Sequence, residues 1–261
     1  MQRLIPGGAS VATRPFPLAR PVPGLSRHAA AALALAALII AYGNVVSLRP
    51  DAWREDYGWA LFAGSLAFVA LLLAWLVLRR VGGLSLKDVG LTRTNAGRSA
   101  LVGAALAAAI ILPVVVYFAF PIGVEGGIGY QDMEQKTWGG FLLWAGVKEP
   151  LGTAFFEEAL FRGVLLAKMT QAWGARWALG ASSLTFALWH LVISYRTIQD
   201  TNAAEPALLA SLAVVASLLG VFVGGLFLGL LRQRTGNLAG CVAFHWLAVI
   251  AMSGTLFLQS R

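Results

Sequence analysis

Long apolar runs constrain this chain more than any other feature. A helix that spans a bilayer needs about 20 mostly apolar residues, and seven runs approach that length. They are rich in Ala and Leu and lack period-two alternation, which argues against strands. The sequence therefore predicts an all-α, polytopic helical membrane protein with about seven transmembrane helices. The runs lie at 29–47, 58–78, 99–120, 140–167, 177–194, 207–231 and 237–258.

Charged residues are scarce and unevenly placed. They make up 12% of the chain, against about a quarter in a soluble domain. The net charge of +8 would suit nucleic acid, but thirteen of the 20 Lys and Arg fall on one side of the predicted membrane and five on the other. That is the positive-inside pattern. We therefore expect an integral membrane protein with a cytoplasmic N-terminus, surrounded by a lipid bilayer and without a nucleic-acid partner. The short chain and loops favour a prokaryotic plasma membrane.

Three regions are predicted along the chain. Residues 1–27 are rich in Pro and Arg and are interpreted as a cytoplasmic tail, and residues 28–138 as N-terminal transmembrane helices and loops. The ionisable residues at membrane depth all fall within 148–245. Residues 139–261 are therefore predicted to form a functional transmembrane core of four helices.

The segment FFEEALFR, residues 155–162, places two glutamates and an arginine in an apolar run. An ionisable group at this depth costs about 2.5–3.5 kcal/mol on insertion scales, so such residues face the bundle interior and are functional candidates. Glu158 and Arg162 are four residues apart and can pair on one helix face. Glu157 is turned about 100° from Glu158 and needs a partner on another helix.

Two of the three histidines, His190 and His245, lie in later runs and are the candidates to partner Glu157. A glutamate and two histidines can bind a divalent metal such as zinc. The glutamate can instead act as a general base on water, with the histidines orienting the water and stabilising an oxyanion. Both arrangements lead to hydrolysis, and the residues leave the choice open. The single cysteine, Cys241, excludes a multi-Cys metal site.

The order and spacing of these residues resemble the CPBP intramembrane proteases. That family is also called Abi, and it includes type II CAAX prenyl endopeptidases and self-immunity proteins. Its motifs are EExxxR, then FxxxH, then a histidine on a later helix, and the resemblance covers roughly residues 140–258. The matching residues here are Glu157, Glu158, Arg162, Phe186, His190 and His245.

The resemblance implies a role for each motif residue. Glu157 would activate the attacking water, His190 would help to position it, and His245 would stabilise the oxyanion. The other motif residues would support the first helix. The implied activity is that of an intramembrane endopeptidase acting on a membrane-anchored protein or peptide. A divalent metal held by Glu157, His190 and His245 is the alternative to a glutamate base.

One position departs from the family pattern. The third motif has Asn or a similar polar residue four positions after the histidine, where this chain has Val249. Losing one oxyanion donor costs on the order of 10²–10³ in rate. Four nearby residues are candidate substitutes for the missing donor. They are Trp189, Ser194, Trp246 and Ser253.

The segment GVKEPLG, residues 146–152, interrupts the fourth run. Pro150 disrupts helical hydrogen bonding, so we expect a bent entry over 139–149 and a regular helix after Pro150. Lys148 and Glu149 are expected to face water.

Two other functions stay open at this point. A catalytically weak or inactive family member would act as a membrane scaffold or an immunity-type protein, a reading that Val249 motivates. A proton-coupled transporter would also use intramembrane Glu and His, although the chain shows no internal repeat of the kind that transporters have.

Overall fold

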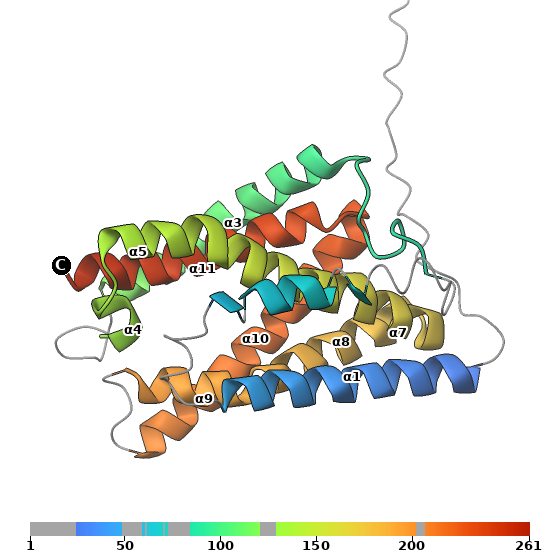
Figure 1. The fold of residues 1–261 in the computed structure, drawn as a ribbon, viewed down its shortest axis with the longest axis horizontal. Helices are drawn as coiled ribbons and strands as arrows, with labels where there is room; N and C mark the ends of the chain where they lie inside the picture. Colours follow the sequence, from blue (N-terminus) through green and yellow to red (C-terminus); the bar gives the residue numbers. More distant parts are fainter. Residues whose placement is uncertain are drawn as a thin grey trace, which may run out of the picture.

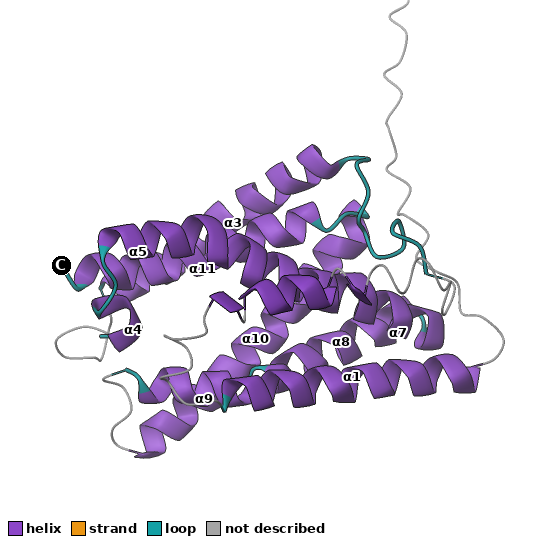
Figure 2. Cartoon of the chain, in the orientation of Figure 1, coloured by secondary structure: helices purple, strands orange, loops and turns teal. Residues whose placement is uncertain are grey.

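Helices form every element of the described part of the chain, apart from one isolated bridge between Tyr130 and Thr201 (Figure 2). The all-α prediction is confirmed. The predicted tail, up to residue 24, and part of the predicted run 58–78 lie outside the described residues. The computed structural model describes residues 25–48, 59–60, 62–69, 71–72, 84–120, 129–201 and 207–261.

The described residues form twelve named helices, of which η2 and η3 are π-helices. They are α1 (Leu25–Ser47), α3 (Ala96–Ala119), α4 (Gln131–Glu134), α5 (Trp138–Leu143), η2 (Trp144–Phe155), α6 (Phe156–Glu158), η3 (Ala159–Leu165), α7 (Leu166–Trp173), α8 (Ala175–Trp189), α9 (Leu191–Gln199), α10 (Ala207–Thr235) and α11 (Ala239–Gln259).

Two groups of helices pack together along the molecule (Figure 1). In one group α1 lies along α7 and α8, and α10 packs against α8. In the other, α11 packs against α3 and η2. The contact between α3 and α11 is close, because a Cβ at Gly103 would lie 2.0 Å from the carbonyl oxygen of Gly240. Small residues allow such approach between membrane helices.

Among the described residues, four helices are long and apolar enough to cross a membrane: His28–Ser47, Ala96–Tyr117, Ala207–Thr235 and Ala239–Gln259. A fifth candidate is the pair α8 and α9, which is bent by 42° at its break. Large apolar side chains stand exposed on these helices, as Leu101 and Leu208 do, which suits contact with lipid. The described residues thus support a membrane protein with four or five spans, and the count of seven is not confirmed.

The fourth predicted run, 140–167, is part of a continuous helical segment from Trp138 to Trp173. This segment alternates between α-helix and the two π-helices. Pro150 lies inside η2, and the wide turns continue to Phe155. The prediction of a regular α-helix directly after Pro150 is therefore wrong. A π-helix bonds each N–H to the carbonyl five residues earlier, so this geometry tolerates the proline at the loss of one such bond.

Because Pro150 has no N–H, one backbone carbonyl of η2 is free to accept a hydrogen bond from another helix. The partner of a Pro150 N–H in η2 would be Ala145, and the Ala145 carbonyl instead accepts a 2.8 Å hydrogen bond from Trp246 Nε1. This contact fastens α11 to η2.

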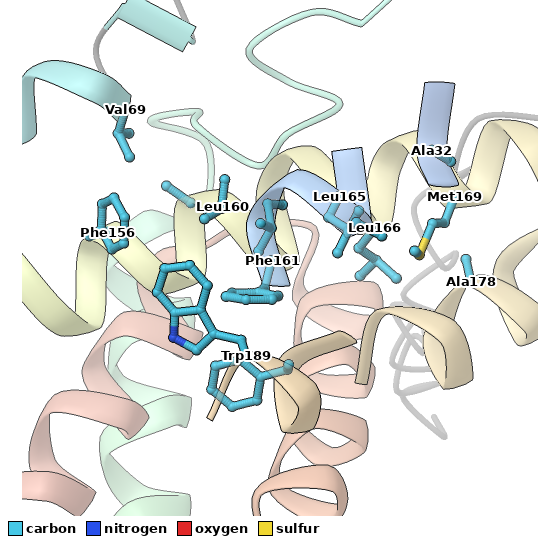
Figure 3. Packing of buried hydrophobic residues seen from close by; sticks show 14 of the residues in the cluster. Ala32, Val69, Phe156, Leu160, Phe161, Leu165, Leu166, Met169, Ala178 and Trp189 are labelled. Carbon is cyan, nitrogen blue, oxygen red and sulfur yellow. The ribbon is translucent and has the colours of Figure 1, made fainter. Parts of the chain in front are cut away.

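The largest cluster of buried apolar residues lies where α1, α6, η3, α7 and α8 meet (Figure 3). Phe161 is fully buried and packs edge-on against Trp189, with ring centroids 5.6 Å apart. Phe156 and Val69 belong to the same cluster. This packing fixes the helix that carries the two glutamates.

Candidate active site

The two glutamates lie on α6, a short α-helical stretch between the two π-helices. Glu157 is 8% exposed and Glu158 is fully buried. Glu158 Oε1 lies 3.0 Å from Arg162 Nη1, so the ion pair expected from their spacing is present. Removing either partner would leave an uncompensated buried charge.

His245 extends this pair to a third helix. Its Nδ1 atom lies 2.9 Å from Glu158 Oε1, the same oxygen that Arg162 contacts. An ionised carboxylate can only accept hydrogen bonds, so Nδ1 carries the proton and donates it to Glu158. The bond fixes the ring of His245 and leaves Nε2 facing Glu157 at 4.0 Å from Oε2.

His190 lies at the break between α8 and α9. Its backbone N–H bonds to the carbonyl of Ala187, three residues earlier, and its Nδ1 atom lies 2.8 Å from the carbonyl of Phe186. A carbonyl can only accept, so Nδ1 is again the donor. The side chain thereby caps a carbonyl at the helix end, and Nε2 lies 3.8 Å from Glu157 Oε2.

Phe186 packs against three of these residues. The guanidinium of Arg162 lies 4.0 Å from its ring centroid, a cation–π distance. The rings of His190 and His245 lie 4.5 Å and 6.4 Å from it, both edge to face. Phe186, the first residue of FxxxH, therefore packs against both His190 of its own motif and Arg162 of EExxxR.

All six residues predicted from sequence thus meet in one place. At its centre is Glu157 Oε2, which is buried and has no hydrogen-bond partner among the residues that the structure describes. The two Nε2 atoms facing it belong to His190 and His245, which are separated by 55 positions in the chain.

A cavity of about 430 Å³ opens onto this site. Glu157 and His190 line its inner end, and aromatic residues such as Trp144 and Trp189 line its walls. Lys148 also lines it and lies 4.4 Å from the ring centroid of Trp59. An apolar segment with a polar group at one end fits such a space.

Glu149 is a buried residue that the sequence interpretation misplaced. It was expected to face water beside Lys148, but its side chain is 3% exposed. The cause is the wide turn of η2, which packs this face of the helix against α11. Glu149 directly precedes Pro150 and was predicted to lie near a helix end, so nothing in the sequence indicated that it would be buried.

Asn44 is a second residue that sequence reasoning missed. Its Nδ2 donates to the carbonyl of Leu188 at 2.9 Å, and its Oδ1 accepts from the N–H of Val192 at 3.0 Å. In a continuous helix these two backbone groups would bond to each other. Asn44, on α1, therefore bridges the break that carries His190.

The candidate substitutes for the missing amide are partly engaged elsewhere. The Trp246 indole donates to the Ala145 carbonyl, and the Ser194 hydroxyl accepts from Ser217 at 3.1 Å. Trp189 packs in the apolar cluster.

A metal held by Glu157 and both histidines does not fit the arrangement. Among the described residues no group of three His, Cys, Asp or Glu side chains is placed to hold a metal ion.

Part of the chain matches the model of a known protein family. Residues 137–251, which contain all six motif residues, match the family model described as type II CAAX prenyl endopeptidase Rce1-like. No curated protein and no solved structure matches the chain.

Proposed function

Residues 137–251 of this chain belong to the type II CAAX prenyl endopeptidase Rce1-like family, and we propose that the protein is an intramembrane endopeptidase whose Glu157 activates the attacking water. Membership supports a CAAX-protease-like membrane endopeptidase, and the long apolar helices support an integral membrane protein. One observation carries the glutamate mechanism: Glu157 Oε2 is buried, faces Nε2 of two histidines and has no hydrogen-bond partner in the described part of the chain.

The distances around Glu157 suit a bridging water. At 3.8 Å and 4.0 Å, the two Nε2 atoms are too far for direct hydrogen bonds and near enough for one water between them. Neutral His190 offers a lone pair at Nε2, because its Nδ1 is the donor. A water that donates one proton to His190 and the other to Glu157 keeps an oxygen lone pair free for attack.

Hydrolysis then proceeds with Glu157 as the proton carrier. It takes a proton from the water as the water oxygen bonds to the carbonyl carbon of the scissile peptide. The C–N bond breaks as the tetrahedral intermediate collapses, and Glu157 passes the same proton to the leaving amine. The carboxylate returns to its starting state, so no further reactant is needed.

His245 stabilises the negative charge that forms on the carbonyl oxygen of the substrate. In the imidazolium form, the ring donates Nδ1–H to the Glu158 carboxylate and also carries a proton at Nε2. Its Nε2–H is then a charged donor that is already oriented before the reaction begins, which is the condition for oxyanion stabilisation. Arg162 holds the Glu158 carboxylate in place for this purpose.

The proposed substrate is a membrane-anchored protein or peptide, and a prenylated CAAX segment is the first to test. The cavity reaches Glu157 and has aromatic walls that suit an apolar chain. Lys148 lines the same cavity and would contact a carbonyl or carboxylate of the bound segment.

A non-catalytic membrane role is the second candidate. Val249 in place of a polar residue favours it, since the amide of the family pattern is absent. The two candidates differ in what the Glu157→Gln change does.

The test is cleavage of an internally quenched farnesylated CAAX peptide by the full chain in liposomes. Glu157→Gln is expected to lower kcat by about 10²–10⁴-fold, with an unchanged melting temperature. The matched control is Glu134→Gln, at an exposed glutamate on α4, which should cleave as the wild type does. Equal cleavage by wild type and Glu157→Gln would remove Glu157 from the mechanism. No cleavage of this or of an unprenylated peptide would favour the non-catalytic role.

A further inference from the structure

Glu149 is a buried carboxyl that the mechanism above does not use. Glu149 is 3% exposed, and its Oε1 atom has no hydrogen-bond partner among the described residues. The side chain is hydrogen-bonded to that of Thr153, a residue that lines the cavity. A polar group buried without its full set of hydrogen bonds costs stability, so a role in the site is the natural reason for its presence.

Glu149 lies opposite the part of α11 that follows His245. The helix from Trp138 to Glu158 runs antiparallel to α11, because Phe257 stacks on Phe141 at one end and His245 bonds to Glu158 at the other. Glu149 lies between these two contacts on its helix, as does Val249 on α11.

Helix geometry turns Val249 toward the same space. Viewed along the axis of α11, Trp246 is rotated by about 100° from His245. Val249 is rotated by about 40° in the same direction, so it lies between the directions of His245 and Trp246. His245 contacts α6 and Trp246 contacts η2. Val249 therefore faces the helix that carries Glu149.

The charges around Glu149 mark it as part of the site. It interacts electrostatically with both His245 and Glu157. Arg162 and, in its imidazolium form, His245 are both paired with Glu158. A carboxyl buried without a cationic partner of its own takes the neutral acid form, and the O–H of that form is a hydrogen-bond donor.

We propose that Glu149 is a further catalytic residue, which donates to the oxyanion beside His245 the hydrogen bond that Val249 cannot provide. The inference rests on the proposed endopeptidase function. Glu149, on η2, would thus replace the polar side chain that α11 lacks at Val249.

The experiment compares Glu149→Gln with Glu149→Leu and Glu149→Met in the farnesylated-peptide assay, with kcat, KM and melting temperature measured for each. The glutamine side chain keeps a donor of the same shape, so its kcat should stay within about tenfold of wild type. The two apolar variants should lose about 10²–10³-fold in kcat with KM nearly unchanged. Their melting temperatures should not fall, because replacing a buried unpaired ionisable group by an apolar one is neutral or stabilising.

Three results would overturn the inference: wild-type kcat in both apolar variants, a glutamine variant as inactive as the leucine variant, or loss of the folded protein in both apolar variants. Glu157→Gln is measured beside them. If wild type cleaves, Glu157→Gln does not and Glu149→Leu does, only the role of Glu149 fails. If wild type shows no cleavage that depends on Glu157, the proposed function fails, and the role of Glu149 with it.

Discussion

Asn44 offers the sharpest test of how the fold positions His190. Its side chain occupies the gap in the backbone ladder between α8 and α9, where it bonds to the Leu188 carbonyl and the Val192 N–H. Asn44→Leu removes both bonds and keeps the volume of the side chain nearly the same. The two backbone groups then have no partner in an environment that offers little water.

The magnitude follows from the number of groups left unpaired. An unsatisfied buried donor or acceptor costs about 1–3 kcal/mol, so two cost about 2–6 kcal/mol. The segment avoids this cost by straightening, because Val192 N–H can then bond the Leu188 carbonyl as in an ordinary helix. Straightening the 42° bend would move His190 away from Glu157. We therefore expect a protein that stays folded but cleaves at least tenfold more slowly.

The assay combines kcat with amide hydrogen exchange over residues 186–194. Asn44→Leu should lower kcat. Asn44→Asp keeps the acceptor for the Val192 N–H and loses the donor for the Leu188 carbonyl, so its kcat should lie between those of wild type and Asn44→Leu. Val45→Ala is the control, since Val45 is on the same helix and 66% exposed. A kcat for Asn44→Leu within twofold of wild type would refute the argument, as would slower cleavage with unaltered exchange in this segment.

Three further predictions concern the ion pair and the cavity. Arg162→Met should lower the free energy of unfolding by about 3–5 kcal/mol, as read from denaturant titration, because Glu158 is left buried and unpaired; a loss under 1 kcal/mol would contradict this. Gly43→Ala should raise KM in the peptide assay, since its Cβ would lie 2.3 Å from the Trp189 ring, which lines the cavity; an unchanged KM would show that the indole shifts without effect. Lys148→Ala should raise KM for a peptide with a free C-terminal carboxylate more than for its amide, and equal changes would exclude contact with that carboxylate.

The sequence predicts local features of this fold well. Runs of apolar residues predict the helices α1, α3, α10 and α11, because length and composition alone determine whether a helix can span a bilayer. Spacing within one helix predicts the pair between Glu158 and Arg162, which the structure contains. The assembly of motif residues was expected from resemblance rather than from the residues themselves.

Other features could not be predicted from spacing. The π-helical turns of η2 change which residues share a face, and that change buries Glu149 instead of exposing it. The bond between His245 and Glu158 joins residues 87 positions apart, and nothing in the pattern of either helix indicates it. Asn44 looks like an ordinary polar residue near a helix end, and its role appears only when α1 meets the break beside His190.

These long-range contacts share one physical cause. A polar backbone or side-chain group at membrane depth must find a partner inside the protein, because lipid offers none. The break at His190 exposes two backbone groups, which Asn44 satisfies, and the proline in η2 frees the Ala145 carbonyl, which Trp246 satisfies. Both departures from regular helix therefore act as attachment points between helices, and both lie beside the residues that meet at Glu157. On this reasoning the irregular turns hold the site together, and restoring a regular helix at either one should cost activity before it costs stability.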